Sequence, residues 1–108
     1  MDIENAKAQM RKGVLEFCIL SVLQRGEAYP SDILSALKEA KMIVVEGTIY
    51  PLLTRLKNDG LLTYRWEESV QGPPRKYYNI TKDGTQFHGE LKKTWDELAL
   101  AVKQTQKP

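Results

Sequence analysis

The distribution of apolar and polar positions predicts three helices in the first half of the chain. Residues 7–25 are apolar on nearly every face, which is typical of a helix buried on more than one side, although Gly13 interrupts the pattern. A second helix is predicted for residues 30–41, because Pro30 suits a first helical turn. In residues 48–58 the apolar positions are spaced i, i+3, i+4 and i+7, so one side of this third helix faces a core. Those positions are Ile49, Leu52, Leu53 and Leu56.

Shorter periods predict the β-structure and a final helix. The β-branched run at residues 42–45 predicts a short strand. Residues 61–66 alternate between apolar and polar, and residues 75–80 are rich in Tyr and Ile, so the two segments predict a hairpin across a Gly-Pro-Pro turn. Thr81 then caps a long helix that reaches about Gln104.

This order of elements predicts an α+β fold, mostly α, of the winged helix-turn-helix type. The winged unit covers residues 28–82, and the long C-terminal helix is an addition to that layout. We therefore divide the chain into a domain of residues 1–82, which includes the helix 7–25, and a C-terminal helix at residues 83–108. The 108 residues suit one small domain with a modest core, which association with a second copy would help.

Composition excludes several classes of protein without choosing a function. The hydrophobic share of 42% and the charged share of 28% are ordinary for a folded soluble domain. No apolar run reaches the roughly 20 residues that cross a bilayer, and the N-terminus lacks the basic-then-apolar order of a secretion signal. The single cysteine, Cys18, forms no internal disulfide, and a cytoplasmic location is expected.

Charge becomes informative only in the hairpin. The net charge of +2, from 16 basic and 14 acidic residues, is weak support for a nucleic-acid partner. Residues 69–82 hold three basic side chains, Arg75, Lys76 and Lys82, and no acidic one, so this segment would meet phosphates. A solvated hairpin tip explains the same pattern equally simply.

The polar side of the third helix supports double-stranded DNA as the partner. Two short helices joined by a tight connection present the second helix to the major groove. Hydroxyl and cationic side chains near a helix N-terminus bond phosphates or base edges. The candidates are Thr48, Pro51 and Thr54, with Tyr50 and Lys57 at the flanks of the helix and Arg75 and Lys76 in the hairpin.

Each of these positions also has an interpretation without DNA. Arg55, on the same helix, would pair with a carboxylate of a neighbouring helix. Tyr50 would be an aromatic at the edge of the core, and Thr48 would be an ordinary cap. Arg75 and Lys76 would keep a hairpin edge from pairing with another chain. The periodic patterns alone leave these alternatives open.

Two segments at their observed separation resemble a known family. Residues 47–62, GTIYPLLTRLKNDGLL, resemble the recognition-helix signature of PadR-family transcriptional regulators. Residues 72–81, GPPRKYYNIT, resemble the wing of that family, and Gly84 matches the glycine that usually follows the wing. Residues 13–37 resemble the family's opening, so the likeness covers about residues 10–85.

The resemblance implies a compact PadR-family member with no large C-terminal domain. Such a protein is a cytoplasmic bacterial or archaeal regulator, usually a repressor, that binds a palindromic operator as a homodimer. The family's DNA contacts would fall on Thr48, Tyr50, Pro51 and Thr54 in the helix, on Arg75 and Lys76 in the wing, and on Tyr29 and Ser31 at the start of the preceding helix.

The final helix carries a heptad-like apolar stripe. Its members are Phe87, Leu91, Trp95, Leu98 and Val102. Little chain remains to cover the stripe, so a second copy is expected to pack on it. A two-fold dimer would set two recognition helices about 34 Å apart, which is one turn of DNA.

The resemblance adds a candidate small-molecule site. Some compact members of the family bind flat aromatic drugs between paired tryptophans, and Trp95 stands at the matching position. Met10, Phe17 and Leu91 would help to line such a site, because Met and aromatic side chains make adaptable walls. The alternative is that Trp95 serves ordinary core or interface packing.

Two other classes of function compete with DNA binding. A winged helix used for protein contact would have an apolar outer face on the third helix, whereas Thr54 and Asn58 are polar. An enzyme is disfavoured because His88 has no Cys, Asp or Ser partner at useful spacing and Cys18 lies in the most apolar helix. No Gly-rich phosphate loop and no set of metal ligands is present, so neither a cofactor nor a metal is expected.

Overall fold

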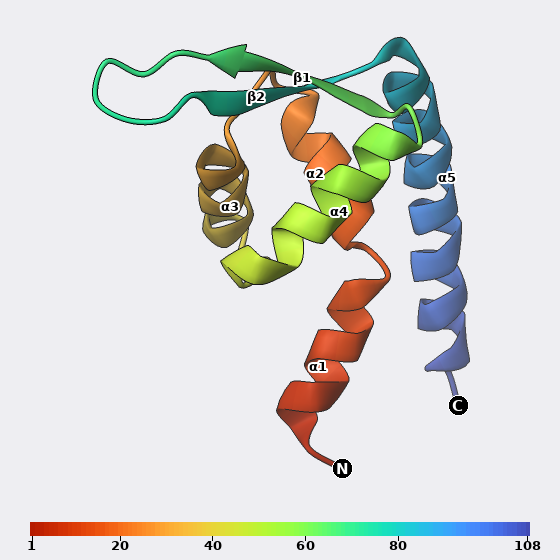
Figure 1. Ribbon diagram of the computed structural model, residues 1–108. Coiled ribbons are helices and arrows are strands. Elements are labelled where there is room, and N and C mark those ends of the chain that lie inside the picture. The colour runs from red at the N-terminus through yellow and green to blue at the C-terminus, as the bar shows by residue number, and fades with distance from the viewer.

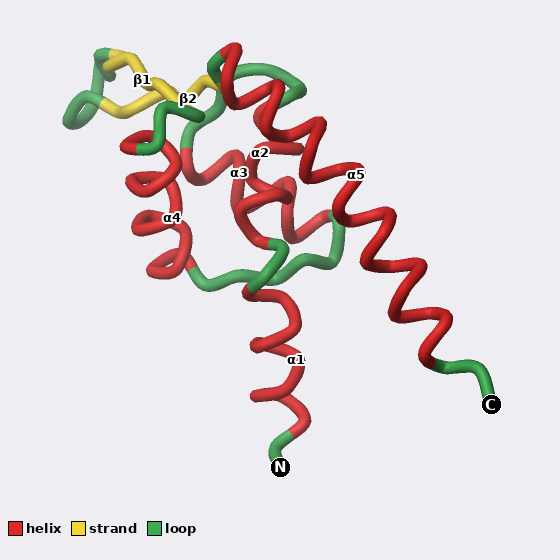
Figure 2. Tube along the Cα trace, turned by 90° about the vertical axis from the view of Figure 1, so that its right-hand side faces the viewer, coloured by secondary structure: helices red, strands yellow, loops and turns green.

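The computed structural model describes all 108 residues as five helices and one hairpin. The elements are α1 (Ile3–Lys12), α2 (Leu15–Leu23), α3 (Pro30–Glu39), α4 (Glu46–Asn58), β1 (Leu62–Glu67), β2 (Arg75–Ile80) and α5 (Lys82–Thr105). Helices α2, α3 and α4 pack beneath the hairpin, while α1 and the end of α5 extend away from them (Figure 1, Figure 2). The predicted fold class, a winged helix with a long C-terminal helix, is confirmed. None of the five helices combines the length and the apolar character of a membrane span.

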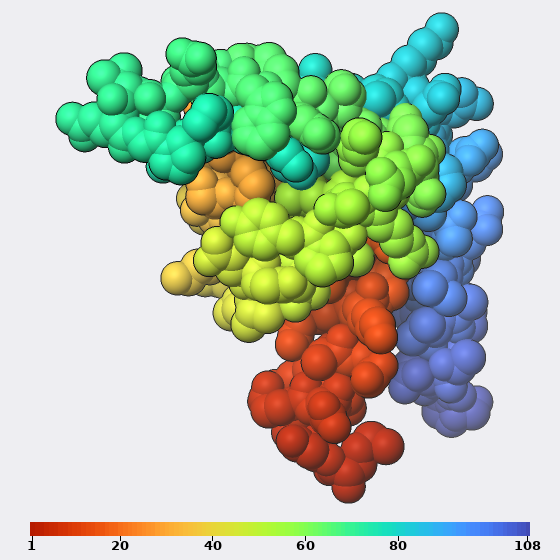
Figure 3. Space-filling model, viewed as in Figure 1, coloured from red at the N-terminus to blue at the C-terminus, as the bar shows by residue number.

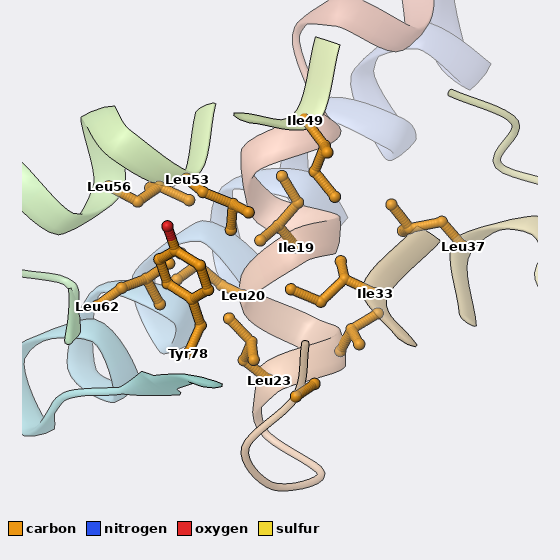
Figure 4. Close-up of a cluster of buried hydrophobic side chains, with 12 residues drawn as sticks. Ile19, Leu20, Leu23, Ile33, Leu37, Ile49, Leu53, Leu56, Leu62 and Tyr78 are labelled. Atoms are coloured by element: carbon orange, nitrogen blue, oxygen red, sulfur yellow. The ribbon is translucent and has the colours of Figure 1, made fainter. Parts of the chain in front are cut away.

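The core lies between α2, α3, α4 and the inner face of the hairpin (Figure 4). Helix α2 enters it on several sides, with Ile19, Leu20 and Leu23 all buried, as its nearly continuous apolar sequence predicts. Helix α4 contributes the predicted stripe, of which Ile49, Leu53 and Leu56 are buried and Leu52 is half-buried. These contacts hold α4 with its polar side outward.

The predicted helix at residues 7–25 is two helices, so that prediction is wrong at the break. Gly13 closes α1, and Val14, with φ −114° and ψ −3°, is the residue before α2, so residues 13–14 form a turn between the two helices. Helix α1 has no buried residue, whereas α2 has five. The chain bends because only the second segment is apolar enough to pack in the core, and α1 leaves in another direction.

The predicted strand at residues 42–45 is also wrong. Lys41, at φ 67°, ends the turn after α3, and residues 42–45 then have no regular secondary structure and no partner strand. Met42 and Val44 are half-buried against the core, while the residues between them are exposed. The burial therefore alternates as in a strand, but a strand also needs a neighbour, which an alternating pattern alone does not provide.

The hairpin is tied to the helices at its base. Strands β1 and β2 are antiparallel, with Leu62 opposite Ile80 and Glu67 opposite Arg75, and β1 begins one residue later than predicted. The third strand position is taken by a single residue, Ala28, whose N–H donates to the Tyr78 carbonyl at 3.0 Å and whose carbonyl accepts from Tyr78 at 2.9 Å.

The start of α5 is joined closely to the end of α4. The predicted cap is confirmed, because the Thr81 hydroxyl accepts from the Gly84 N–H at 2.9 Å, and it also donates to the Gly60 carbonyl at 2.7 Å. Gly84 is buried, and a Cβ there would overlap the carbonyl oxygen of Leu61. Glycine is therefore required at this position by close packing, although glycine lowers helix propensity.

Candidate nucleic-acid interface

A surface hollow of about 550 Å³ lies between the start of α3, the start of α4 and the wing, which we define as residues 62–80. In Figure 3 the wing projects over α3 and α4 on one side of the molecule. Six of the nine predicted DNA contacts line this hollow: Tyr29, Ser31, Tyr50, Thr54, Arg75 and Lys76. Pro51 lies on an adjoining depression along α4, and Thr48 and Lys57 lie outside both.

The outer side of α4 is polar and exposed, as predicted. The helix begins at Glu46, two residues earlier than predicted, so Thr48 lies in its first turn with an exposed side chain. Tyr50 is 46% exposed, and its hydroxyl donates to the Glu46 carboxylate at 2.9 Å. This hydrogen bond raises the pKa of Tyr50 above its ordinary value. Tyr50 is therefore a surface residue and not an edge of the core.

Two cations of the wing have no carboxylate partner. The Arg75 guanidinium lies 5.6 Å from the centre of the Tyr29 ring, and Lys76 Nζ lies 4.5 Å from the Tyr64 ring and 5.3 Å from the Trp66 ring. Aromatic faces of this kind hold a cation in place without neutralising it. Both charges therefore remain available to an anion at the hollow.

A third cation of the wing, Arg65, is fully occupied. It donates to both oxygens of Glu27, at 3.1 and 2.8 Å, and also pairs with Glu67. The hydrogen bond from Arg65 holds the pKa of Glu27 below its ordinary value. Beside this pair, Tyr29 stacks on Tyr77 with ring centres 3.9 Å apart. Arg65 thus ties the wing to the connection between α2 and α3 and is not free for a ligand.

Two further cations on α4 have partners within the chain. Arg55 pairs with Glu16 of α2 at 3.4 Å, which confirms the interpretation in which it meets a carboxylate of a neighbouring helix. Arg55 is 67% exposed, so the pair contributes little stability. Lys57 Nζ lies 5.8 Å from the Tyr64 ring, on the side of α4 nearest β1.

Four residues that line the hollow are not among the predicted DNA contacts: Pro30, Glu46, Trp66 and Tyr78. Glu46 was missed because it precedes the predicted start of the helix by two residues. Trp66 lies on the predicted strand two residues after Tyr64, and this period of two is the signal that both side chains share a face, on which Lys76 is paired with Trp66. Trp66 is 59% exposed.

Residues 19–90, two thirds of the chain, match the family described as transcriptional regulator PadR-like. The chain belongs to the PadR-like family of transcriptional regulators. A PadR-like transcription factor from Bacteroides fragilis is 60% identical, with a TM-score of 0.79 over 94% of this chain and 98% of that one.

Two further comparisons concern a named PadR protein. The negative transcriptional regulator PadR of Bacillus subtilis is 35% identical over 68% of this chain and 42% of its own length. A crystal structure of Bacillus subtilis PadR in complex with operator DNA is 31% identical, with a TM-score of 0.68 over 72% of this chain and 46% of that chain. This PadR-like chain therefore spans less than half the length of that relative. The relatives are described as regulators and not as enzymes.

His88 of this PadR-like chain has a partner that the sequence analysis did not find. The fold brings its Nε2 within 2.9 Å of the Ser21 hydroxyl on α2, and its ring lies 5.2 Å from that of Phe17. Ser21 already donates to the Phe17 carbonyl at 2.9 Å, so it accepts from His88. The pair holds α5 against α2.

The single cysteine of the chain, Cys18, is not activated as a nucleophile. Burial raises the pKa of the Cys18 thiol, which makes it a poorer nucleophile.

A second hollow, of about 530 Å³, lies between α1 and the end of α5. It is mainly apolar and is lined by Met10, Arg11, Gly13, Val14, Trp95, Leu98, Ala99 and Val102. Two of the four predicted ligand contacts, Met10 and Trp95, are brought together there. The other two lie elsewhere, since Phe17 faces His88 and Leu91 packs against the core.

Proposed function

We propose that this PadR-family chain is a sequence-specific DNA-binding regulator that uses the hollow between α3, α4 and the wing. The observation that carries the proposal is the pair of unpartnered cations, Arg75 and Lys76, beside the exposed first turns of two helices. In such an arrangement the recognition helix reads base edges and the wing cations meet phosphates. Tyr29 and Ser31 contribute phosphate contacts at the start of α3, while Thr48, Tyr50, Pro51 and Thr54 face the bases, with Lys57 at their flank.

We further propose that the regulator is a repressor that acts in the cytoplasm as a homodimer on a palindromic operator. The operator complex of Bacillus subtilis PadR and its description as a negative regulator support operator binding and repression. Residues 1–82 would read DNA, and residues 83–108 would hold two copies together. The second assignment is supported by large apolar side chains on α5 that this chain leaves uncovered: Trp95, Leu98, Leu100 and Val102.

The second hollow supports a planar aromatic effector that controls the dimer. Its volume falls in the usual range for small-molecule sites, and its walls are mostly apolar. Trp95 would stack on the ligand and Met10 would adapt to its edge. Phe17 and Leu91 lie outside this hollow, so the proposal rests on the first two residues.

Selection of bound duplexes from a random pool tests DNA recognition. We expect recovery of a palindrome and a binding constant that falls with salt. Lys76→Ala should weaken binding to all sequences alike and reduce the salt slope by about 1, whereas Thr54→Ala should change the recovered sequence. Lys93→Ala, an exposed change on α5, is the control for loss of one positive charge. No salt-dependent affinity would refute the proposal and favour a protein-contact function.

Tryptophan fluorescence tests the effector. Because the chain has two tryptophans, the measurement uses Trp66→Phe, in which Trp95 is the single reporter. A panel of planar cationic dyes should quench Trp95 and shift its emission, and Met10→Ala should weaken that response. An unmoved spectrum across the panel, at concentrations where the dimer persists, would rule out the site.

A further inference from the structure

One acidic side chain stands in the hollow that we assign to DNA. Glu46 is the first residue of α4 and shares the hollow with Arg75 and Lys76, yet it forms no ion pair with either. A carboxylate in a surface that faces phosphates is repelled by them, so its presence there needs a physical reason. Acidic residues in a first helical turn do favour the helix dipole, and that is the simplest explanation of its charge.

The geometry at Glu46 goes beyond what a helix dipole requires. The Tyr50 hydroxyl donates to Oε1 of Glu46 at 2.9 Å, one turn along the exposed side of the helix. The Tyr50 hydroxyl is the one hydrogen-bond partner of this carboxylate in the chain, so Oε2 accepts no hydrogen bond. The carboxylate, which lines the hollow, is therefore held by one oxygen and keeps the other free to accept a hydrogen bond. An acceptor fixed in this way at the start of a recognition helix is placed to receive a donor from a base edge.

The major groove limits which base can supply that donor. Guanine presents only acceptors there, and thymine presents an acceptor and a methyl group. Adenine presents an amino group beside the N7 acceptor, which a carboxylate would face unfavourably. Cytosine presents its N4 amino group as the one hydrogen-bonding group of its edge, and Glu is a matching acceptor for it.

We propose that Glu46 determines operator specificity by accepting a hydrogen bond from the N4 amino group of a cytosine, with Tyr50 as the residue that positions its carboxylate. This inference rests on the DNA-binding function proposed above. The negative charge then acts twice: it gains a hydrogen bond at cytosine, and it repels the acceptor edges of guanine and thymine. The repulsion toward phosphates is the cost of this discrimination.

The test compares Glu46→Gln with the wild type on selected duplexes. Glutamine keeps the shape of the side chain and an oxygen for the Tyr50 hydroxyl, but it loses the charge. The wild type should recover a fixed cytosine in each half-site, and replacing that C·G pair by T·A should cost about tenfold in affinity. Glu46→Gln should reduce that penalty to about threefold or less, or move the preference to adenine, which Gln reads in two bonds.

Two further variants separate the possible causes. Glu39→Gln, an exposed change at the end of α3, removes the same charge outside the hollow and should leave the base preference unchanged. Tyr50→Phe keeps the ring but releases the carboxylate, so it should lower the cytosine preference while the salt slope stays the same. Thermal unfolding of each variant should match the wild type, because these side chains are exposed.

The results distinguish failure of this inference from failure of the proposed function. If Glu46→Gln tightens binding to all duplexes equally and the base preference persists, the carboxylate is only a repulsive charge and the inference is wrong. If the wild type selects a palindrome without a fixed cytosine, the inference is again wrong while DNA binding stands. If the wild type shows no salt-dependent affinity, both fail together.

Discussion

The molecule has two regions that bury their apolar residues to very different extents. The head, residues 15–91, contains the twelve-residue core cluster, with Ile33 and Leu53 completely buried. The arms, which are α1 and residues 92–105, extend away from the head (Figure 2). They contain no buried residue. Apolar side chains occur in both, but in the arms Met10 remains 80% exposed and Leu98 53% exposed. The head therefore folds on contacts within one chain, whereas the apolar surface of the arms is left for other contacts.

The largest expected effect is on the free energy of unfolding and comes from a substitution in the core of the head. Leu53→Ala removes a fully buried side chain where α4 meets α2, and large-to-small changes in a core cost about 2–5 kcal/mol of unfolding free energy. Urea denaturation should show the same loss at every protein concentration. Leu98→Ala, an identical change in an arm, is the matched control. A loss below about 1 kcal/mol for Leu53→Ala would mean that the head is not one packed core.

A second pair of substitutions tests where the head ends along α5. At Gly84 a Cβ would overlap backbone, which cannot move aside, so Gly84→Ala should destabilise the protein by about 1–3 kcal/mol. At Gly89 nothing lies within 4 Å, so Gly89→Ala should stabilise it by about 0.5–1 kcal/mol through helix propensity alone. Opposite signs in thermal unfolding are the expected outcome, and equal signs would contradict the packing at Gly84.

A substitution in the arms should change the association of two chains, which depends on protein concentration. Leu98 lines the second hollow, and Leu98→Ala should raise the dimer dissociation constant about tenfold, which is the effect of truncating one of the few residues at the centre of an interface. Sedimentation over a dilution series measures this constant. Leu100→Ala, which changes an equally exposed leucine outside that hollow, should have a smaller effect. A wild type that stays monomeric throughout the series would remove the dimer from the proposal.

The smallest expected effect is at the tie between the wing and the head. Since Arg65 lowers the pKa of Glu27 in the folded state, this contact stabilises the protein above the ordinary carboxyl pKa and is lost as pH falls through the lower folded value. Wild type and Glu27→Gln should therefore differ in melting temperature at neutral pH and converge below about pH 4. The difference should be small because Glu27 and Arg65 are both exposed. A constant difference down to pH 3 would exclude this contact as its cause.

Local sequence patterns were enough to predict the helices and strands that depend mainly on their own residues. The core side of α4 follows from the spacing of its apolar residues, and the bounds of β2 follow from its Tyr and Ile content after the Gly-Pro-Pro turn. The cap at Thr81 follows from a hydroxyl side chain at the first position before the helix. The segment at residues 42–45 shows the limit. Its β-branched run predicts a strand, but pairing depends on a neighbour, and the wing pairs instead with Ala28.

The candidate site shows the same limit in its charges. Arg65 and Arg75 are the same residue type in one hairpin, yet only Arg75 is unpaired. The difference comes from Glu27, which lies 38 positions away from Arg65 in the sequence. Whether Glu46 belongs to α4, and so to the site, depends on the residue at which the helix begins. Helix ends are set by hydrogen bonds that a periodic pattern does not specify. The sequence therefore predicted where the site lies better than which of its charges are free.

The junction at Thr81 and Gly84 has a mechanical consequence. The Thr81 hydroxyl bonds both to Gly60, just after α4, and to Gly84, in the first turn of α5. Because Gly84 has no Cβ, the backbone of α5 packs directly on the carbonyl of Leu61. Each chain therefore carries α4 rigidly at the end of a rod, since the 24 residues of α5 extend about 36 Å. In any pair of chains that cross through these rods, the crossing angle sets the tilt and separation of the two α4 helices. A rotation at the far ends would therefore change the relative placement of the two α4 helices.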